Sequence, residues 1–281
     1  MRSFSQVDVF TSEAFRGNPL AVVVGADGMS DQEMAQFANW TNLSETTFLL
    51  SPTVPAADYR VRIFTPSTEL PFAGHPTIGS CHVWLEAGGA PKADQIVQEC
   101  GVGLVPLRRS GDRLAFAAPP LIRGGDVDDV DLAQVCRILK VDRSEIVASQ
   151  WADNGPGWIA VLLKDADAVL ALEPDFSAAE VFDVGVVGLR KVGVAGVALD
   201  DAVEVRAFFR NGGHAAEDPA TGSLNASLAQ WLLGSGRVES PYIARQGTAI
   251  GRAGRIYIDE ADGEIWVGGD AVTCITGLVE L

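Results

Sequence analysis

The sequence lacks the features that mark metal-binding, secreted and membrane-spanning proteins. Its four cysteines are widely separated and form no Cys-x-x-Cys pair, and it has only three histidines. Because structural metal sites need closely spaced Cys and His ligands, we expect no metal. No apolar run is long enough to cross a bilayer, since Arg190 and Lys191 interrupt the longest candidate. A strand-like segment at 7–10 leaves no room for a signal peptide, so we predict a cytoplasmic protein.

Positive charge is also scarce. The chain has 21 Lys and Arg against 37 Asp and Glu, which gives a formal net charge of −16. Binding to nucleic acid or to anionic membranes depends on clustered Lys and Arg, so neither partner is expected. A small anionic metabolite would need a local positive field, which the N-terminus of a helix can supply.

Several motifs that mark common cofactor and enzyme classes are missing. The glycine-rich segment 185–196 lacks the Gly-x-Gly-x-x-Gly spacing of dinucleotide-binding proteins, and no Gly-x-Ser-x-Gly elbow occurs. The acidic run 126–131 lacks the spacing, the Gly and the Glu of a calcium-binding EF-hand loop. Dinucleotide binding and an EF-hand calcium site are therefore not expected.

The length and the strand pattern predict two α+β halves. A chain of 281 residues can form two domains, each with its own core. The segment 117–131, rich in Pro, Gly and acidic residues, is the best candidate linker. We place the first half at 1–118 and the second at 119–269, with a final strand at about 270–281 that can return to the first half. Strands and helices do not alternate regularly, which favours α+β over a doubly wound sheet.

Apolar runs and capping residues give the expected elements. The strands are predicted at 5–10, 20–24, 46–50, 60–64, 96–100, 104–106, 146–149, 158–163, 193–199, 203–209, 242–245, 255–258, 264–267 and 274–280. The helices are predicted at 31–40 after a Ser30 or Asp31 cap, from Pro76 to Gly88–Gly89, at 131–139, around 177–182, and from Pro219 to about 233.

The most informative feature is a short motif that occurs twice. The segments HPTIGS, from His75, and DPATGS, from Asp218, align at a constant offset and share Pro, Gly and Ser. A strand-like segment precedes each copy, and an apolar helix-like run follows each. The pattern predicts a duplicated fold in which one helix N-terminus from each half points to a shared site.

Each of these residues also has an ordinary structural interpretation. An Asp before a Pro that opens a helix, as Asp218 is, is typical of an N-cap. His75 occupies the equivalent place, where a histidine is an acceptable cap. Gly222 can serve only to let the helix pack closely, or it can open the first turn to a ligand beside Ser223. The two interpretations of the Gly-Ser pair are compatible.

Two residues outside the motif are further candidates. Glu45 precedes an apolar strand; a loop glutamate is usually a solvated charge, but a buried one would have a raised pKa and could move protons near neutral pH. Asn18, in a Gly-Asn-Pro sequence, is either a turn former or an amide that binds substrate.

Four segments resemble the PhzF-like family of phenazine biosynthesis: VDVFTSEAFRGNPLAVV, NLSETTFLL, FTPSTELPFAGHPTIGS and EDPATGSLNASLAQWL. Residues 246–252 are similar to a further family segment, and all five follow the family's order over nearly the whole chain. The resemblance implies the diaminopimelate-epimerase-like fold. In that fold two similar halves, related by a pseudo-twofold axis, each wrap a curved, mostly antiparallel sheet around a central helix, with the active site between them.

The resemblance also implies cofactor-free isomerase chemistry on a carbon acid. Glu45 would be the general acid/base that takes a proton from one carbon and returns it to another, and His75 and Asp218 would assist proton transfer or orient the substrate. Gly74 and Ser223 would hold a carboxylate at the helix starts and stabilise developing negative charge. Family members are commonly homodimers, so a homodimer is expected.

The sequence departs from the wider superfamily at both helix starts. The cysteine pair of diaminopimelate epimerases and proline racemases is missing, because Gly74-His75 and Asp218 stand in those places. Racemisation by two thiols is therefore disfavoured. His214 adds a third ionisable group near the second copy. The phenazine-pathway substrate is accordingly not transferred to this chain.

Two functions follow. The first is an isomerase or epimerase that moves a proton between carbons of a small carboxylate-bearing metabolite. The second is a non-catalytic protein that binds such a carboxylate on the same fold. The presence of Glu45, His75 and Asp218 together favours the first, because carboxylate binding alone does not require two acids.

Overall fold

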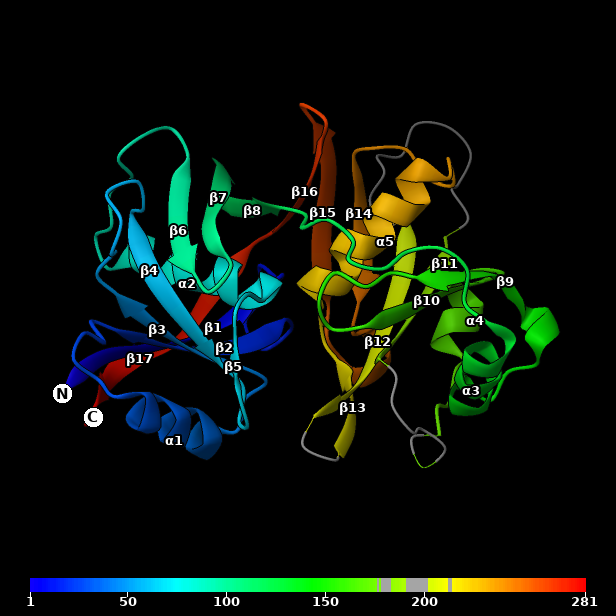
Figure 1. Ribbon diagram of the computed structural model, residues 1–281, viewed down its shortest axis with the longest axis horizontal. Helices are drawn as coiled ribbons and strands as arrows, with labels where there is room; N and C mark the ends of the chain where they lie inside the picture. The colour runs from blue at the N-terminus through cyan, green and yellow to red at the C-terminus, as the bar shows by residue number, and fades with distance from the viewer. Residues whose placement is uncertain (176, 178–182, 191–201, 212–213) are drawn as a thin grey trace. The chain divides into compact units, whose positions relative to one another are not determined.

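The computed structural model describes residues 1–175, 177, 183–190, 202–211 and 214–281, which form two compact units (Figure 1). Unit 1 consists of Met1–Ala117 and Gly268–Leu281, and unit 2 of Ala118–Val267. The strand predicted at 193–199 lies outside the described residues, and so does the helix predicted around 177–182, apart from Ser177.

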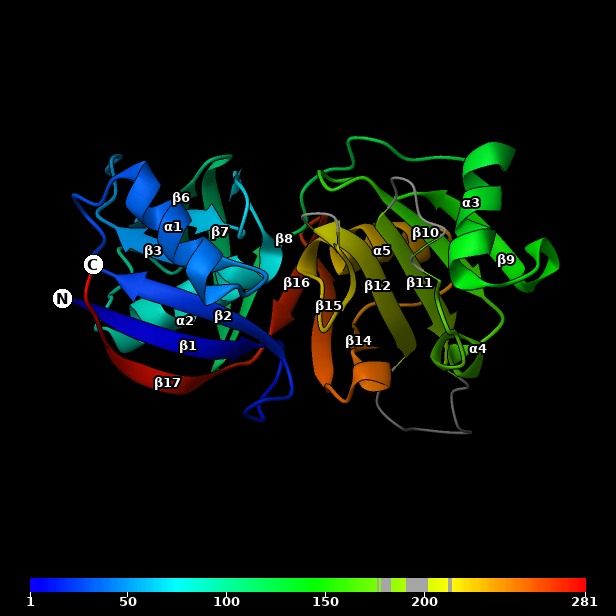
Figure 2. The ribbon, with the colours of Figure 1, turned by 90° about the horizontal axis from the view of Figure 1, so that it is seen from below.

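Unit 1 contains nine strands and two helices within its described residues. The strands are β1 (Arg2–Val9), β2 (Asn18–Val24), β3 (Thr46–Leu50), β4 (Tyr59–Phe64), β5 (Glu69–Leu70), β6 (Ile96–Cys100), β7 (Gly103–Ser110), β8 (Arg113–Ala117) and β17 (Ala271–Val279), and the helices are α1 (Asp31–Thr41) and α2 (Gly74–Glu86). The C-terminal strand β17 pairs antiparallel with β1, so both ends of the chain lie in this unit (Figure 2).

Helix α1 covers the outer face of the unit 1 sheet. Ser30 and Glu33 form a reciprocal capping box at its start, and Asn42 ends it in the left-handed conformation. Met34 and Phe37 pack into a cluster that includes strand residues such as Phe48. The predicted helix and its Ser30 cap are confirmed.

Helix α2 lies at the centre of unit 1 (Figure 1), where it contacts β1, β2, β3, β4, β8 and β17. Nine of its 13 residues are buried, which is typical of a helix surrounded by other elements. A Cβ on Gly79 would lie 2.6 Å from Leu20 Cδ2 and 2.9 Å from Val9 Cγ2. Gly79 therefore allows the close approach of α2 to β1 and β2, which is the packing role considered for the Gly of this motif.

Unit 2 holds the remaining elements. Its strands are β9 (Ile146–Trp151), β10 (Trp158–Leu163), β11 (Asp183–Leu189), β12 (Val203–Asn211), β13 (His214–Asp218), β14 (Tyr242–Gln246), β15 (Gly254–Ala261) and β16 (Glu264–Gly269, which crosses the unit boundary), and its helices are α3 (Asp129–Leu139), α4 (Ala166–Leu170) and α5 (Gly222–Gly234). Short 3₁₀ turns occur at Arg143–Glu145 and Thr248–Ile250. Helix α5 is buried over nine of its 13 residues, as α2 is.

The strand pairings of unit 1 recur in unit 2. The pairs β1–β2, β3–β4, β4–β5 and β6–β7 are antiparallel, while β2–β3 and β4–β6 are parallel. The corresponding pairs β9–β10, β11–β12, β12–β13 and β14–β15 are antiparallel, and β10–β11 and β12–β14 are parallel. In each unit the central helix follows the same hairpin. The α+β fold class is confirmed, and the topology is duplicated.

Both motif helices begin at residues other than those predicted. Helix α2 begins at Gly74 after an Ala73 cap, so His75 lies inside the helix rather than at its cap. Helix α5 begins at Gly222 after a Thr221 cap, not at Pro219. The N-cap interpretation of Asp218 is wrong because this residue pairs with Ala207 in the β12–β13 ladder, which keeps its backbone extended.

Replacing Gly79 by Ala should destabilise the protein by about 1–3 kcal/mol, because the new methyl group would overlap Leu20 and Val9 in a well-packed core. Gly234, the last residue of α5, offers the control, since a Cβ there meets nothing within 4 Å. Urea unfolding should show a lower midpoint for Gly79→Ala than for the wild type, and no decrease for Gly234→Ala. Equal midpoints for the two variants would contradict the packing role.

Candidate active site

The clearest candidate site lies at the N-terminus of α2, where His75 meets Glu45. The two atoms His75 Nε2 and Glu45 Oε2 are 3.3 Å apart. Both side chains are largely withdrawn from solvent, with 7% of the His75 side chain and 16% of the Glu45 side chain exposed. The half-buried position of Glu45 differs from that of an ordinary solvated loop glutamate.

Asn18 completes this arrangement. Its side-chain nitrogen Nδ2 lies 3.4 Å from His75 Nδ1, the other ring nitrogen, and its side chain is fully buried. The sheet explains why these residues meet. Strands β2 and β3 run parallel, with Ala21 opposite Thr46. Asn18 at the start of β2 and Glu45 just before β3 therefore lie at the same end of the two strands. We name Asn18, Glu45 and His75 the α2 N-terminal cluster.

Burial keeps the imidazole of His75 neutral. Desolvation disfavours the imidazolium and lowers the pKa of His75 from its ordinary value of 6.5 to about 3. A neighbouring carboxylate favours the charged ring, but here burial has the larger effect. At neutral pH His75 can therefore act as a neutral hydrogen-bond donor or acceptor.

The backbone at the start of α2 adds donors to the cluster. Thr77 N–H is the first to bond within the helix, to Ala73 C=O. The N–H groups of Gly74 and His75 precede it and have no partner in the helical ladder, and Pro76 has no N–H. Such a helix start favours a negative group by its dipole and its free donors. Gly74 thus lies where the sequence predicted a carboxylate-holding residue.

Asp218 belongs to a second network, at the start of α5 in unit 2. Its Oδ2 accepts a hydrogen bond from Thr221 Oγ1 at 2.6 Å. Gln246, which is fully buried, accepts from Thr221 N at 3.0 Å and from Asn225 Nδ2 at 2.8 Å, and donates to Thr221 Oγ1 and the Asp218 carbonyl. Gln246 therefore caps the helix in place of the Asp218 carboxylate. Sequence reasoning noted its segment but assigned it no role.

Ser223 and its neighbour Gly222 open α5, as the first two residues of that helix. The Ser223 hydroxyl accepts from Trp158 Nε1 at 3.2 Å, and the Ser223 carbonyl accepts from Asn154 Nδ2 at 2.9 Å. Because the hydroxyl accepts from the indole, its own proton can still be donated. The predicted binding role of Gly222 and Ser223 stays a prediction.

A buried glutamine contacts a motif threonine in each unit. In unit 1 the buried Gln98 donates from Nε2 to Thr77 Oγ1, as Gln246 does to Thr221 in unit 2. Each Gln lies on the strand that pairs parallel with the strand before the motif. The two threonines hold different places in their helices, because Thr77 is the fourth residue of α2 and Thr221 is the N-cap of α5.

His214, the third ionisable group noted in the sequence, lies at the start of β13, and its side chain is outside the described part of the structure. Within the described residues no group of three or more His, Cys, Asp and Glu side chains could hold a metal ion. Among the helices that the structure describes, none has both the length and the apolar character that spanning a membrane requires.

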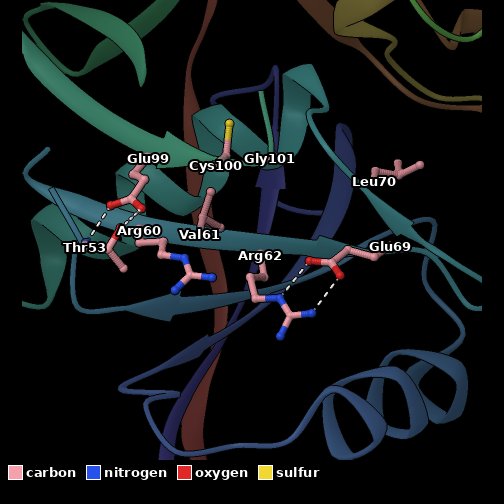
Figure 3. Close-up of a pocket in the computed structure, with 9 residues that line it drawn as sticks. All are labelled: Thr53, Arg60, Val61, Arg62, Glu69, Leu70, Glu99, Cys100 and Gly101. Atoms are coloured by element: carbon pink, nitrogen blue, oxygen red, sulfur yellow. Dashed lines mark hydrogen bonds and ion pairs between the residues drawn. The ribbon is translucent and has the colours of Figure 1, made fainter. Parts of the chain in front are cut away.

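A separate cavity of about 260 Å³ opens on unit 1 beside β4 (Figure 3). Arg62 from β4 forms a two-bond ion pair with Glu69 of β5 at its wall. The cavity is lined by Thr53, Arg60, Val61, Arg62, Glu69, Leu70, Glu99, Cys100 and Gly101. None of the predicted site residues is among them.

Comparison with known proteins shows the family of this chain. Residues 7–277 match the family model described as phenazine biosynthesis-like protein. The chain belongs to this family. The predicted resemblance is thereby confirmed over nearly the whole length.

Two curated relatives and one solved structure illustrate the similarity. Antisense-enhancing sequence 1 of Schizosaccharomyces pombe is 38% identical, over 98% of this chain and 97% of its own. The trans-2,3-dihydro-3-hydroxyanthranilate isomerase of Pseudomonas aeruginosa is 32% identical, over 92% of this chain and 90% of its own. A phenazine biosynthesis protein of Enterococcus faecalis shares the fold, with a TM-score of 0.80 at 23% identity, over 100% of this chain and 99% of that one. The family is one of enzymes, and its relatives include named isomerases.

The lowered pKa of His75 predicts a specific dependence of stability on pH. The unfolded chain binds a proton at His75 below about pH 6.5, whereas the folded protein binds it only below about pH 3. Between these values, acid therefore stabilises the unfolded state by about 1.4 kcal/mol per pH unit through this residue.

Urea unfolding of the wild type and of His75→Gln at several pH values between 7 and 4 isolates the effect of this residue. The wild type should lose stability relative to the variant as the pH falls. A difference that stays constant over this range would show that the folded protein protonates His75 normally.

Proposed function

We propose that this protein is an isomerase or epimerase that moves a proton between carbons of a small carboxylate-bearing metabolite, with Glu45 as the general acid/base. The observation that supports this most directly is the 3.3 Å approach of a half-buried carboxylate to a buried, neutral imidazole at a helix N-terminus. Candidate general bases are recognised first by such geometry.

The proposed reaction has two proton transfers. The Glu45 carboxylate takes a proton from a carbon of the substrate, and the electron pair of that C–H bond delocalises into the conjugated system of the substrate. The protonated Glu45 then gives a proton to the same or another carbon, which restores the carboxylate. An epimerase returns it to the same carbon, and an isomerase to a different one.

His75 and the start of α2 would stabilise the charge that develops between these transfers. A neutral imidazole can donate a hydrogen bond to a developing anion and keep its proton, because the N–H of the neutral ring is a much weaker acid than the imidazolium. The free N–H groups of Gly74 and His75 are suited to hold the substrate carboxylate. Both transfers use protein groups alone, so the proposal includes no metal or organic cofactor.

Asp218 has a supporting part in this proposal. The residue is buried, with 8% of it exposed, and its carboxylate already accepts a hydrogen bond from the Thr221 hydroxyl. A carboxylate held in this way can orient a substrate hydroxyl or amine, or relay a proton. The cytoplasmic location and the homodimer expected from the sequence remain predictions.

The named relatives suggest a class of substrate. One of them is a trans-2,3-dihydro-3-hydroxyanthranilate isomerase, whose substrate by name is a cyclic, partly unsaturated amino acid with a carboxylate. Unsaturation beside a carboxylate is what a carbon acid needs to delocalise its electron pair. We therefore propose an unsaturated or α-acidic carboxylate as substrate, with that compound as the first to be tested.

The competing functions fit less well. A non-catalytic carboxylate-binding protein would not need Glu45 withdrawn from solvent beside a neutral histidine. A thiol racemase would need reactive thiolates, but Cys81 on α2 is fully buried, and burial raises its pKa to about 12. Insensitivity of turnover to iodoacetamide would agree with the carboxylate mechanism.

Replacing Glu45 by Gln should lower the rate of proton transfer by about 10²–10⁴-fold, because the amide cannot take up the proton. Deuterium uptake from D₂O into a panel of small carboxylates, followed by NMR, measures this rate. Glu86→Gln is the matched control: His82 Nε2 and Glu86 Oε1 on the same helix are also 3.3 Å apart, but more exposed. A Glu45→Gln variant with the wild-type rate would refute the mechanism.

A further inference from the structure

The side chain of Asn18 differs from a substrate-binding amide in its surroundings. It is fully buried at the first residue of β2, and its Nδ2 faces His75 Nδ1 at 3.4 Å. Its amide therefore acts on the histidine. The sequence left Asn18 as either a turn former or a substrate-binding amide, and the structure adds this contact with His75.

The chemistry of the contact selects one form of the ring. An amide nitrogen carries two hydrogens and no acceptor, so it can bond only to a ring nitrogen that is bare. With Nδ1 accepting from Asn18, the single proton of a neutral imidazole must reside on Nε2. That nitrogen is the one 3.3 Å from Glu45 Oε2.

With Glu45 ionised, as the proposed mechanism needs, the opposite side of the ring favours the same form. A bare Nε2 would direct its lone pair at the Glu45 carboxylate, which repels it, whereas an Nε2–H is attracted. His75 Nε2 also forms no well-aligned hydrogen bond within the described residues, although it is buried. Its proton is thus close to Glu45 without being committed to it, and can be donated to a bound substrate.

From this geometry we propose that Asn18 is a positioning residue that fixes His75 in the Nε2–H tautomer, so that its proton faces the reacting centre beside Glu45. Residues that hold a catalytic histidine in one tautomer and orientation are a common requirement of acid/base sites. The role rests on the proposed function, because it matters only if His75 stabilises charge during a reaction. The tautomer itself can be measured without any substrate.

The first measurement is made on the wild-type protein, uniformly labelled with ¹⁵N. Two-dimensional ¹H–¹⁵N NMR of the imidazole rings distinguishes the protonated nitrogen from the bare one, and the His75 signals are identified by their loss in His75→Gln. We expect Nε2 protonated and Nδ1 bare at pH 7. A ring with the proton on Nδ1, or an even mixture of tautomers, would overturn the proposal whether or not any variant folds.

Asn18→Asp is the sharpest variant. An ionised Asp is an acceptor only, so it should draw the proton to Nδ1, giving the reversed tautomer or the imidazolium. Ser80→Ala serves as the matched control, since it removes another buried hydrogen bond of α2, from Ser80 Oγ to Thr47 Oγ1 at 2.9 Å, and should leave the ring unchanged. An unchanged Nε2–H tautomer in a folded Asn18→Asp protein would overturn the proposal.

The consequence for activity separates this role from a structural one. In the deuterium-uptake assay Asn18→Asp should lower kcat about 100-fold, with little change in KM, because the carboxylate-holding backbone is intact. A changed tautomer with unaltered kcat would refute the positioning role while leaving the proposed function standing. Loss of activity in Glu45→Gln alone, with Asn18→Asp fully active, would have the same meaning.

Discussion

The contact between Glu45 and His75 is the interaction on which the functional interpretation depends, and its geometry is set by the burial of α2. The first residues of α2, Gly74 to Cys81, are all buried, so His75 meets its partners within the protein. Gly79 allows α2 to lie directly on β1 and β2, while the Ser80 hydroxyl bonds to Thr47 of β3. These contacts hold α2 against the sheet, and burial of the His75 ring removes the positive charge that an exposed histidine could carry.

The duplicated topology gives each unit a buried helix, but the two helix starts have different chemistry. In unit 1 the first turn contains Gly74 and His75 and faces Glu45. In unit 2 the residue before the motif proline is Asp218, whose backbone is still part of a strand and whose carboxylate accepts a hydrogen bond from Thr221. Buried glutamines, Gln98 and Gln246, support the two starts through the same type of bond. The two units thus share their strand pairing and buried helix, while the ionisable groups at the helix starts differ. A fold can keep its framework while the residues of its site change.

Much of the fold could be predicted from the sequence, because strand and helix patterns there are local. The strands at 46–50, 96–100 and 158–163 occur at the predicted residues. The Ser30 cap of α1 could be predicted because the Ser30 side chain bonds to Glu33, only three residues away. The starts of α2 and α5 could not be predicted, since they depend on where the preceding hairpin stops pairing. A Pro after Asp218 gives the same local signal at the end of a strand as at the start of a helix.

The site could be predicted as a set of residues but not as an arrangement. The repeated motif points to His75, and the family resemblance gives Glu45 its role. Their approach depends on parallel pairing of β2 with β3, which no single segment encodes. The role of Gln246 and the partner of Asn18 are contacts between segments distant in sequence. Such contacts become visible only when the sheet order is known.

The most direct test of this account is a crystal structure of the protein with a bound carboxylate substrate or a close analogue. We predict that the ligand carboxylate accepts hydrogen bonds from the backbone N–H groups at Gly74 and His75. One of its carbons should lie within reach of a Glu45 carboxylate oxygen, and His75 Nε2 should face the developing charge. A well-ordered ligand bound elsewhere, with Glu45 and His75 left in contact only with each other, would contradict the account.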